Sequence, residues 1–508
     1  MKKLLIVALI IGLGFVAFIE NDSNEDNEVN SITAHIDILN EFTKLEEIPR
    51  ESGHMNEISN YLRTWAKDKG FVVVRDNYSN VIITQPASKG YEDAPTTILQ
   101  VNMDMPVTTA DGVTFNPKND SIQLINDGET LKGDGTNLGA ASGIGISTAM
   151  YILSNAQNHG PLKVIFTANK ETTMAGAKNI DSKYLEGDYL INLAANTDTS
   201  LVYGNADTYS YEMTRKIQWT SPKNTAAYLL SINGLNEDNS RFNAHAGGGN
   251  AIKAIGEVLA LAQSQGIIFE LASFIGGSSD SLIPAEASAL VVINDSDIRK
   301  FEKVFKSQAS SFKKTYGEFE KNYQFTFTES ILPEKVISGD DSSSIIAFTY
   351  GELNGVQSWL KEADRIAESA SNLSMVSTLS GKFISELSTI SYSPYMTKEI
   401  EDAHQAVASL SGMNFRLLES TPGWMTKQDR PLPTLMMKSY SALFTEEMKT
   451  KLLYESLECG WFAQKNPKLQ IISVGVHIIN KNSPDETLYL DSIEKPAILL
   501  QTFLEQAK

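Results

Sequence analysis

The sequence is poor in the residues that most often bind metals, with one cysteine and six histidines among 508 residues. A single cysteine, Cys459, excludes an internal disulfide and a cysteine-based structural zinc site. No histidine follows a predicted strand beside clustered carboxylates, so we expect each to lie at the surface or to be satisfied locally. Cys459 is expected to be a buried core thiol. The histidines are His35, His54, His159, His245, His404 and His477.

Positive charge is also scarce, because 43 Lys and Arg face 62 Asp and Glu and give a net charge of −19. This balance argues against nucleic acids and anionic membrane surfaces as partners, since both are themselves negative. The hydrophobic content of 42% is ordinary for a globular protein. The length allows more than one domain, because single cores stop growing at roughly 250–300 residues.

Long apolar runs are missing except at the N-terminus, where Lys2 and Lys3 precede an uncharged apolar segment at residues 4–19. A basic start followed by such a run predicts an exported protein. The segment either stays as a membrane anchor or is cleaved as a signal peptide within residues 1–20; a buried helix is the third interpretation. The polar, acidic residues 21–34 are expected to form a tether.

The rest of the chain alternates helical and strand patterns, which predicts an α/β sheet covered on both faces. Helices are expected at residues 31–47 and 56–69, the first with Ile32, Ile36, Leu39 and Phe42 on its apolar face. Short strands are expected at residues 71–74, 81–84, 98–101, 162–167 and 189–192. Residues 131–147 read as a glycine-rich loop that feeds a buried helix from Ile144 onward.

That loop, Gly135-Thr136-Asn137-Leu138-Gly139-Ala140-Ala141-Ser142-Gly143-Ile144-Gly145, resembles the metal-site loop of the zinc-dependent aminoacyl-histidine dipeptidases, a family of di-zinc exopeptidases. Further short matches follow in the same order, among them Leu457-Glu458-Cys459-Gly460 and Ser483-Pro484-Asp485-Glu486. The resemblance covers about residues 35–505. It implies a di-zinc-peptidase-like α/β domain at residues 35–207 and 391–508, with an inserted α+β lid or dimerisation domain at residues 208–390.

The resemblance also assigns the family's site positions, and most of them have lost their chemistry. The five zinc-ligand positions are Asn102, Ala141, Glu171, Ala194 and Tyr454, of which only Glu171 could bind a metal. The general-base position is Lys170, whose ammonium cannot take a proton from water at neutral pH. Asp104, which supports a ligand in the family, is retained. The family's substrate-binding lid positions are Asn239, Gly248 and Ser281.

Lys170 offers a replacement for the missing cations, because its ammonium would offset the charges of Asp104 and Glu171. The other interpretation is that Lys170 points to solvent. A nucleophile is not indicated, since Ser142 lacks the Gly-x-Ser-x-Gly context and no histidine can be paired to it from the sequence.

These patterns favour an exported, non-catalytic homologue of the dipeptidases that acts as a binding or structural protein, with no cofactor. The alternative is an active metallo-dipeptidase with a rearranged zinc site that uses Asp104 and Glu171. An unidentified peptide or protein is the expected partner. The resemblance adds a homodimer formed through the lid, and the membrane is expected to be involved only through residues 4–19.

Overall fold

The computed structural model describes residues 22–236, 248–279, 282–361, 366–379 and 381–508, with side chains from Ser31 onward. The chain divides into two compact units. The first comprises Met1–Gly204, Trp424–Leu453 and Leu457–Lys508, and the second Asn205–Gly423 and Tyr454–Ser456. The second unit thus extends past residue 390, where we expected its end. The reason is that β19 (Asn414–Thr421) pairs along β9 (Asp207–Lys216), which belongs to the second unit.

The first unit is built on a nine-stranded sheet whose central strands are parallel. Its order is β1-β2-β6-β3-β7-β22-β8-β20, with β21 paired to β8. The strands are β1 (Val72–Arg75), β2 (Val81–Gln85), β6 (Leu162–Thr167), β3 (Thr97–Asn102), β7 (Tyr189–Ala195), β22 (Gln470–Gly475), β8 (Ser200–Asn205), β20 (Trp424–Met425) and β21 (Lys449–Leu453). The five strands predicted from the sequence are confirmed within a few residues at each end.

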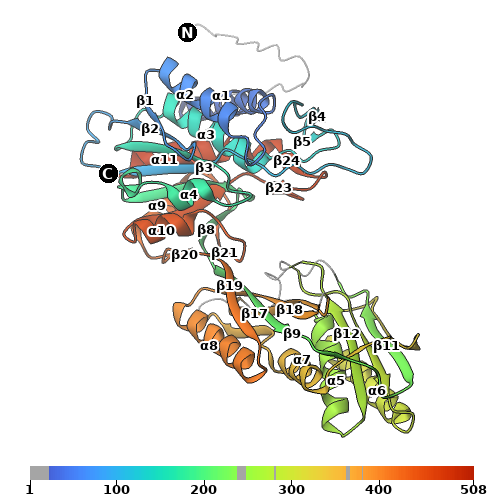
Figure 1. Cartoon of the computed structure of the whole chain (residues 1–508). Helices are drawn as coiled ribbons and strands as arrows, with labels where there is room; N and C mark the ends of the chain where they lie inside the picture. Colours follow the sequence, from blue (N-terminus) through green and yellow to red (C-terminus); the bar gives the residue numbers. More distant parts are fainter. Residues whose placement is uncertain (1–21, 237–247, 280–281, 362–365, 380) are drawn as a thin grey trace. The chain divides into compact units, whose positions relative to one another are not determined.

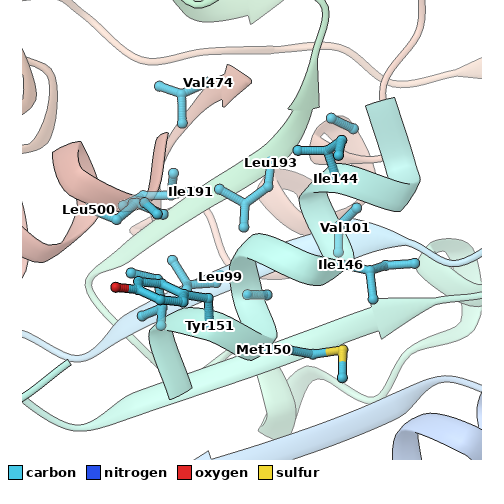
Figure 2. Packing of buried hydrophobic residues seen from close by; sticks show 14 of the residues in the cluster. Leu99, Val101, Ile144, Ile146, Met150, Tyr151, Ile191, Leu193, Val474 and Leu500 are labelled. Atoms are coloured by element: carbon cyan, nitrogen blue, oxygen red, sulfur yellow. The ribbon is translucent and has the colours of Figure 1, made fainter. Parts of the chain in front are cut away.

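Helices cover both faces of this sheet, because alternate strand residues face opposite sides. On one face, Leu99 and Ile191 pack against α3, as Figure 2 shows, while Ile98 and Leu190 on the other face pack toward α10. The helices of the first face are α1 (Asp22–Leu45), α2 (Asn56–Asp68), α3 (Ala140–Asn155), α9 (Pro431–Leu443) and α11 (Lys495–Gln506). Those of the second face are α4 (Ala175–Asn179), α10 (Cys459–Lys465) and the 3₁₀ turn η1 (Ser182–Leu185).

Cys459 lies in this second-face core and is fully buried, as predicted. Burial raises the pKa of its thiol well above the ordinary value. A small sheet of order β23-β24-β5-β4 completes the unit. Its strands are β23 (Ile478–Ile479), β24 (Thr487–Tyr489), β5 (Thr130–Gly133) and β4 (Leu124–Asn126), and the 3₁₀ turn η3 (Leu490–Ser492) follows β24.

The first helix corrects two predictions. It starts at Asp22, so the backbone of residues 22–34 is helical rather than an irregular tether, and Ala34 is fully buried. The apolar face is also different, because Ile32 and Ile36 are 52% and 41% exposed. The fully buried residues are Ala34, Ile38, Phe42 and Leu45.

Helix α3 begins at Ala140, four residues before the predicted start. The carboxylate of Glu486 accepts the backbone N–H groups of Gly139 at 3.3 Å and Ala140 at 2.9 Å, which caps the helix N-terminus. Glycine within the helix is required by packing, because a Cβ at Gly145 would lie 2.6 Å from the carbonyl oxygen of Leu193. Gly145 therefore allows close packing of the helix onto the sheet, whereas Gly135 and Gly139, with φ of +70° and +63°, lie in the loop before α3 as predicted.

The second unit is a nine-stranded, antiparallel sheet with four helices packed on one face among the described residues (Figure 1). The strand order is β14-β11-β13-β12-β17-β18-β9-β19, with β16 beside β17. The remaining strands are β14 (Gln324–Glu329), β11 (Ala226–Asn233), β13 (Ala287–Ile293), β12 (Phe269–Gly276), β17 (Ala367–Ser377), β18 (Lys382–Ser391), β16 (Gly355–Trp359), and the pair β10 (Trp219–Thr220) and β15 (Val336–Ile337). The helices are α5 (Ala251–Ser264), α6 (Ile298–Tyr316), α7 (Gly339–Gly351) and α8 (Pro394–Leu410).

These two units confirm the predicted fold class, an α/β domain with an inserted α+β domain. No helix within the described ranges is long and apolar enough to cross a bilayer. The predicted signal or anchor at residues 4–19 lies outside those ranges.

Candidate functional site

The positions that the resemblance singled out in the first unit meet at one edge of its sheet. Strands β3, β6 and β7 are parallel, so their carboxyl ends lie side by side. Asn102 ends β3, Ala194 lies near the end of β7, and Lys170 and Glu171 follow β6. The N-terminus of α3 adds Ala141. These five residues and Asp104 line one small cavity, called here the edge pocket.

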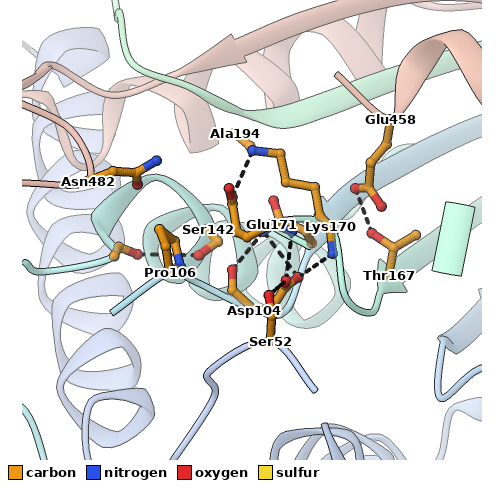
Figure 3. Close-up of polar contacts among 12 residues, drawn as sticks. Ser52, Asp104, Pro106, Ser142, Thr167, Lys170, Glu171, Ala194, Glu458 and Asn482 are labelled. Atoms are coloured by element: carbon orange, nitrogen blue, oxygen red, sulfur yellow. Dashed lines mark hydrogen bonds and ion pairs between the residues drawn. The ribbon is translucent and has the colours of Figure 1, made fainter. Parts of the chain in front are cut away.

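Asp104 accepts several hydrogen bonds in the edge pocket (Figure 3). Its buried carboxylate accepts the backbone N–H groups of Lys170 and Glu171, each at 3.0 Å, and the hydroxyl of Ser52. The side-chain amide of Asn102 donates to the backbone carbonyl of Asp104 at 2.7 Å. Asp104 therefore holds the turn after β6 in place, and its oxygens are engaged by the protein itself.

Lys170 and Glu171 form an ion pair across the pocket, with 2.7 Å between Nζ and Oε1. Their side chains are only 8% and 16% exposed. The interpretation in which Lys170 points to solvent is therefore wrong. The pairing with Glu171 is as expected, whereas the hydrogen bonds from Lys170 and Glu171 to Asp104 come from their backbone N–H groups.

A buried carboxyl that the sequence analysis did not single out lies beside this pair. Glu458 Oε2 accepts hydrogen bonds from Thr167 at 2.7 Å and Gln100 at 2.8 Å, while Oε1 has no partner among the described residues. Burial raises the pKa of Glu458 to about 8; Asp104 raises it further, and Thr167, Gln100 and Lys170 oppose the shift. At neutral pH Glu458 therefore keeps its proton.

Glu458 ends a row of buried polar side chains that crosses the parallel strands. Ser473 donates to Asn192 at 2.6 Å, Asn192 to Gln100 at 2.7 Å, and Gln100 to Thr167 at 3.0 Å. Four neighbouring strands, β22, β7, β3 and β6, thus contribute one residue each. The polar residues Gln100 and Asn192 inside otherwise apolar strands were the sequence signal for this row.

On the other side of the edge pocket, Arg50 supports the loop before α3. Its guanidinium pairs with Glu46 at 2.6 Å, and donates to Ser142 Oγ at 2.9 Å and to the carbonyl of Gly139 at 3.2 Å. Burial raises the pKa of Glu46 to about 7, against the opposing effect of Arg50. Ser142 is thus a structural contact of Arg50.

The remaining predicted site positions belong to the second unit or lie outside the described residues. Tyr454 belongs to the second unit, where its hydroxyl accepts a hydrogen bond from the backbone N–H of Ala367 at 2.8 Å. Gly248 precedes α5 in the second unit, and Asn239 and Ser281 lie outside the described ranges. Among the histidines, His245 is also outside. His35 pairs with Glu494 at 2.9 Å and buried His404 with Glu352, as expected for locally satisfied side chains.

The donor set does not fit a di-zinc centre. Zinc in proteins takes three or four nitrogen, sulfur or oxygen donors. Ala141 and Ala194 offer no donor, and the carboxylate of Glu171 is paired with an ammonium that repels cations. Within the described part of the chain, no group of three or more His, Cys, Asp or Glu side chains could hold a metal ion.

Comparison with known proteins places this site in a peptidase fold. No protein-family profile matches the chain. The cytosol non-specific dipeptidase of Escherichia coli (strain K12) is 26% identical over 467 residues, which cover 92% of this chain and 96% of that protein. The crystal structure of aminoacylhistidine dipeptidase from Vibrio alginolyticus superposes with a TM-score of 0.85 and 28% identity, over 93% of this chain and 96% of that one.

A tripeptidase from Staphylococcus aureus shares the fold alone, with a TM-score of 0.53 at 15% identity. The chain therefore has a two-unit peptidase fold. Over almost its whole length the chain is homologous to these two dipeptidases, as its motifs predicted.

Proposed function

We propose that this homologue does not hydrolyse peptides through a metal centre and acts as a binding or structural protein. The observation that supports the proposal is the Lys170–Glu171 ion pair inside the edge pocket. A general base must accept a proton at neutral pH, and an ammonium has no lone pair to do so. The position that activates water in the family is therefore occupied by a group that cannot.

The space in the edge pocket supports the same conclusion. The volume open to the centre of a water molecule is about 10 Å³, which suffices for about one water. Small-molecule sites usually offer roughly 300–1,000 Å³. The side chains of Lys170 and Glu171 line this space.

An active metallo-dipeptidase with a rearranged site is the alternative. The comparisons favour it, because both relatives are named as dipeptidases and match almost the whole chain. It requires Glu171 to release Lys170 and bind a metal, and Asp104 to exchange its backbone hydrogen bonds for a metal or a reacting water. The donor set of the edge pocket is the argument against it.

Hydrolysis assays separate the two. Purified protein with added Zn²⁺ is incubated with Xaa-His and other dipeptides, and released amino acids are measured. We expect no turnover above that of a heat-denatured sample. Turnover that disappears with a chelator and with Glu171→Ala, but persists in the exposed control Glu129→Ala, would establish the alternative.

Three further properties remain part of the proposal. The basic start and the apolar residues 4–19 support export. Cell fractionation tests this proposal, and the test is needed because the E. coli relative is named as a cytosolic protein. A homodimer through the second unit rests on the resemblance; sedimentation of the protein from residue 30 onward as a monomer at micromolar concentration would refute it. The partner is a peptide or protein, to be identified by crosslinking in the native organism.

A further inference from the structure

A second cavity, called here the helix-end cleft, opens in the first unit and shares no lining residue with the edge pocket. It offers about 750 Å³, which is within the range of small-molecule sites. The C-terminal ends of α3 and α9 meet there beside α11; all three helices are labelled in Figure 1. Nothing in the proposed function uses this cleft.

The helix-end cleft is electronegative. The C-cap residues of α3 and α9, Ala156 and Phe444, both line it, and a helix C-terminus carries a partial negative charge. Neither helix has a basic residue in its last turn. Glu505 on α11 adds a carboxylate, and the described lining residues include no Lys, Arg or His. Two helix ends and a carboxylate therefore face one space without a cation.

The remaining lining residues suit a cation that carries an apolar stem. Tyr151 and Phe444 supply aromatic rings, which attract cations, and Leu443 and Ile498 supply apolar surface. Gln501 is hydrogen-bonded to the hydroxyl of Tyr151. An anion would find no positive partner, and a wholly apolar ligand would leave the amide and hydroxyl groups without hydrogen bonds.

We propose that the helix-end cleft binds an organic cation, an ammonium or guanidinium group on a short alkyl stem. The charged group lies near Glu505 and the two helix ends, and its stem packs on Leu443 and Phe444. Free polyamines and the Lys or Arg side chains of a peptide share this chemistry. The net charge of −19 favours the approach of either ligand.

Isothermal titration of the full chain at low salt tests the inference. The probes are spermidine and acetyl-Gly-Lys-Gly-amide, with acetyl-Gly-norleucine-Gly-amide as the uncharged control of similar stem. We expect the two cations to bind, the norleucine peptide not to, and added salt to weaken binding. Tighter binding of spermidine assigns a polyamine, and tighter binding of the lysine peptide a basic peptide. Equal binding of the norleucine peptide, or no heat with either cation, overturns the proposal.

Variants locate the site. Asn158→Lys places a competing ammonium at an exposed lining residue and should abolish binding. Glu505→Gln should weaken it by about twofold to fivefold, the usual effect of one exposed charge. Glu129→Gln, an exposed change elsewhere in the unit, should leave the affinity unchanged. Unchanged affinity in Asn158→Lys would contradict the assignment, provided that its melting temperature equals that of the wild type.

Discussion

Removing the ammonium of Lys170 should destabilise the first unit, because Glu171 would lose its partner beside the buried carboxylate of Asp104. The pair is 2.7 Å long and its side chains are 8% and 16% exposed, so it lies between an exposed pair, at about 0–1 kcal/mol, and a fully buried one, at about 3–5 kcal/mol. We expect Lys170→Met to cost about 1–3 kcal/mol of unfolding free energy. For a unit of this size the melting temperature should fall by about 2–5 °C.

Lys170→Glu should cost more, since it adds a third negative charge to the edge pocket. Acidification should reduce the loss of unfolding free energy in both variants. Without the ammonium, protonation of a carboxylate in the edge pocket removes the repulsion between the negative charges. Thermal unfolding at about pH 5 and pH 8 measures this. Lys183→Met is the matched control, because Lys183 pairs with Asp181 at 3.1 Å but is 60% exposed. If Lys170→Met melts at the same temperature as the wild type at pH 8, or loses no more stability than Lys183→Met, the Lys170–Glu171 pair does not stabilise the first unit.

Three other substitutions test the contacts around the site and in the second unit. Glu458→Gln should flatten the pH dependence of the unfolding free energy, because the pKa of Glu458 in the folded protein, about 8, exceeds the ordinary 4.5. In the wild type, the contribution of Glu458 to the unfolding free energy is fully present below about pH 4.5. It falls as the pH rises toward 8, by at most about 1.4 kcal/mol per pH unit. Urea unfolding from pH 5 to 8 checks this, and parallel curves for the two proteins would contradict it. Lys253→Met should lower the unfolding free energy of the second unit by about 1–3 kcal/mol. The reason is that Nζ donates to the carbonyls of Thr349, Tyr350 and Glu352 at 2.7–2.8 Å, at the end of α7. Urea unfolding measures this loss. Gly145→Ala should lower the unfolding free energy by about 1–3 kcal/mol, although alanine is the better helix former, because its Cβ would lie 2.6 Å from Leu193 O. A rise in melting temperature would show that the helix can shift.

The sequence predicted what local pattern and motif can encode. The strands of the first sheet and the helix α2 follow from hydrophobic periodicity and from Gly70, whose φ of +82° ends the helix. The gathering of Asn102, Lys170 and Ala194 at one sheet edge follows from parallel strands. These features depend on residues close in sequence or on the common direction of the strands.

The missed features depend on distant partners. The start of α3 is set by Glu486, more than three hundred residues away, so the glycines alone suggested a loop. The buried face of α1 is chosen by what packs beneath it, which left Ile32 and Ile36 exposed. Glu458 was predicted only as part of a motif, because the burial that raises its pKa depends on strands far away in the sequence.

The zinc content of the protein is the most direct measure of whether it lacks a working metal centre. The protein is purified from zinc-supplemented culture without chelator, dialysed against metal-free buffer, and analysed for zinc per chain by elemental analysis. The donor set around Lys170, Ala141 and Ala194 predicts well below one zinc per chain. Two zinc ions per chain would show that the protein holds a di-zinc centre.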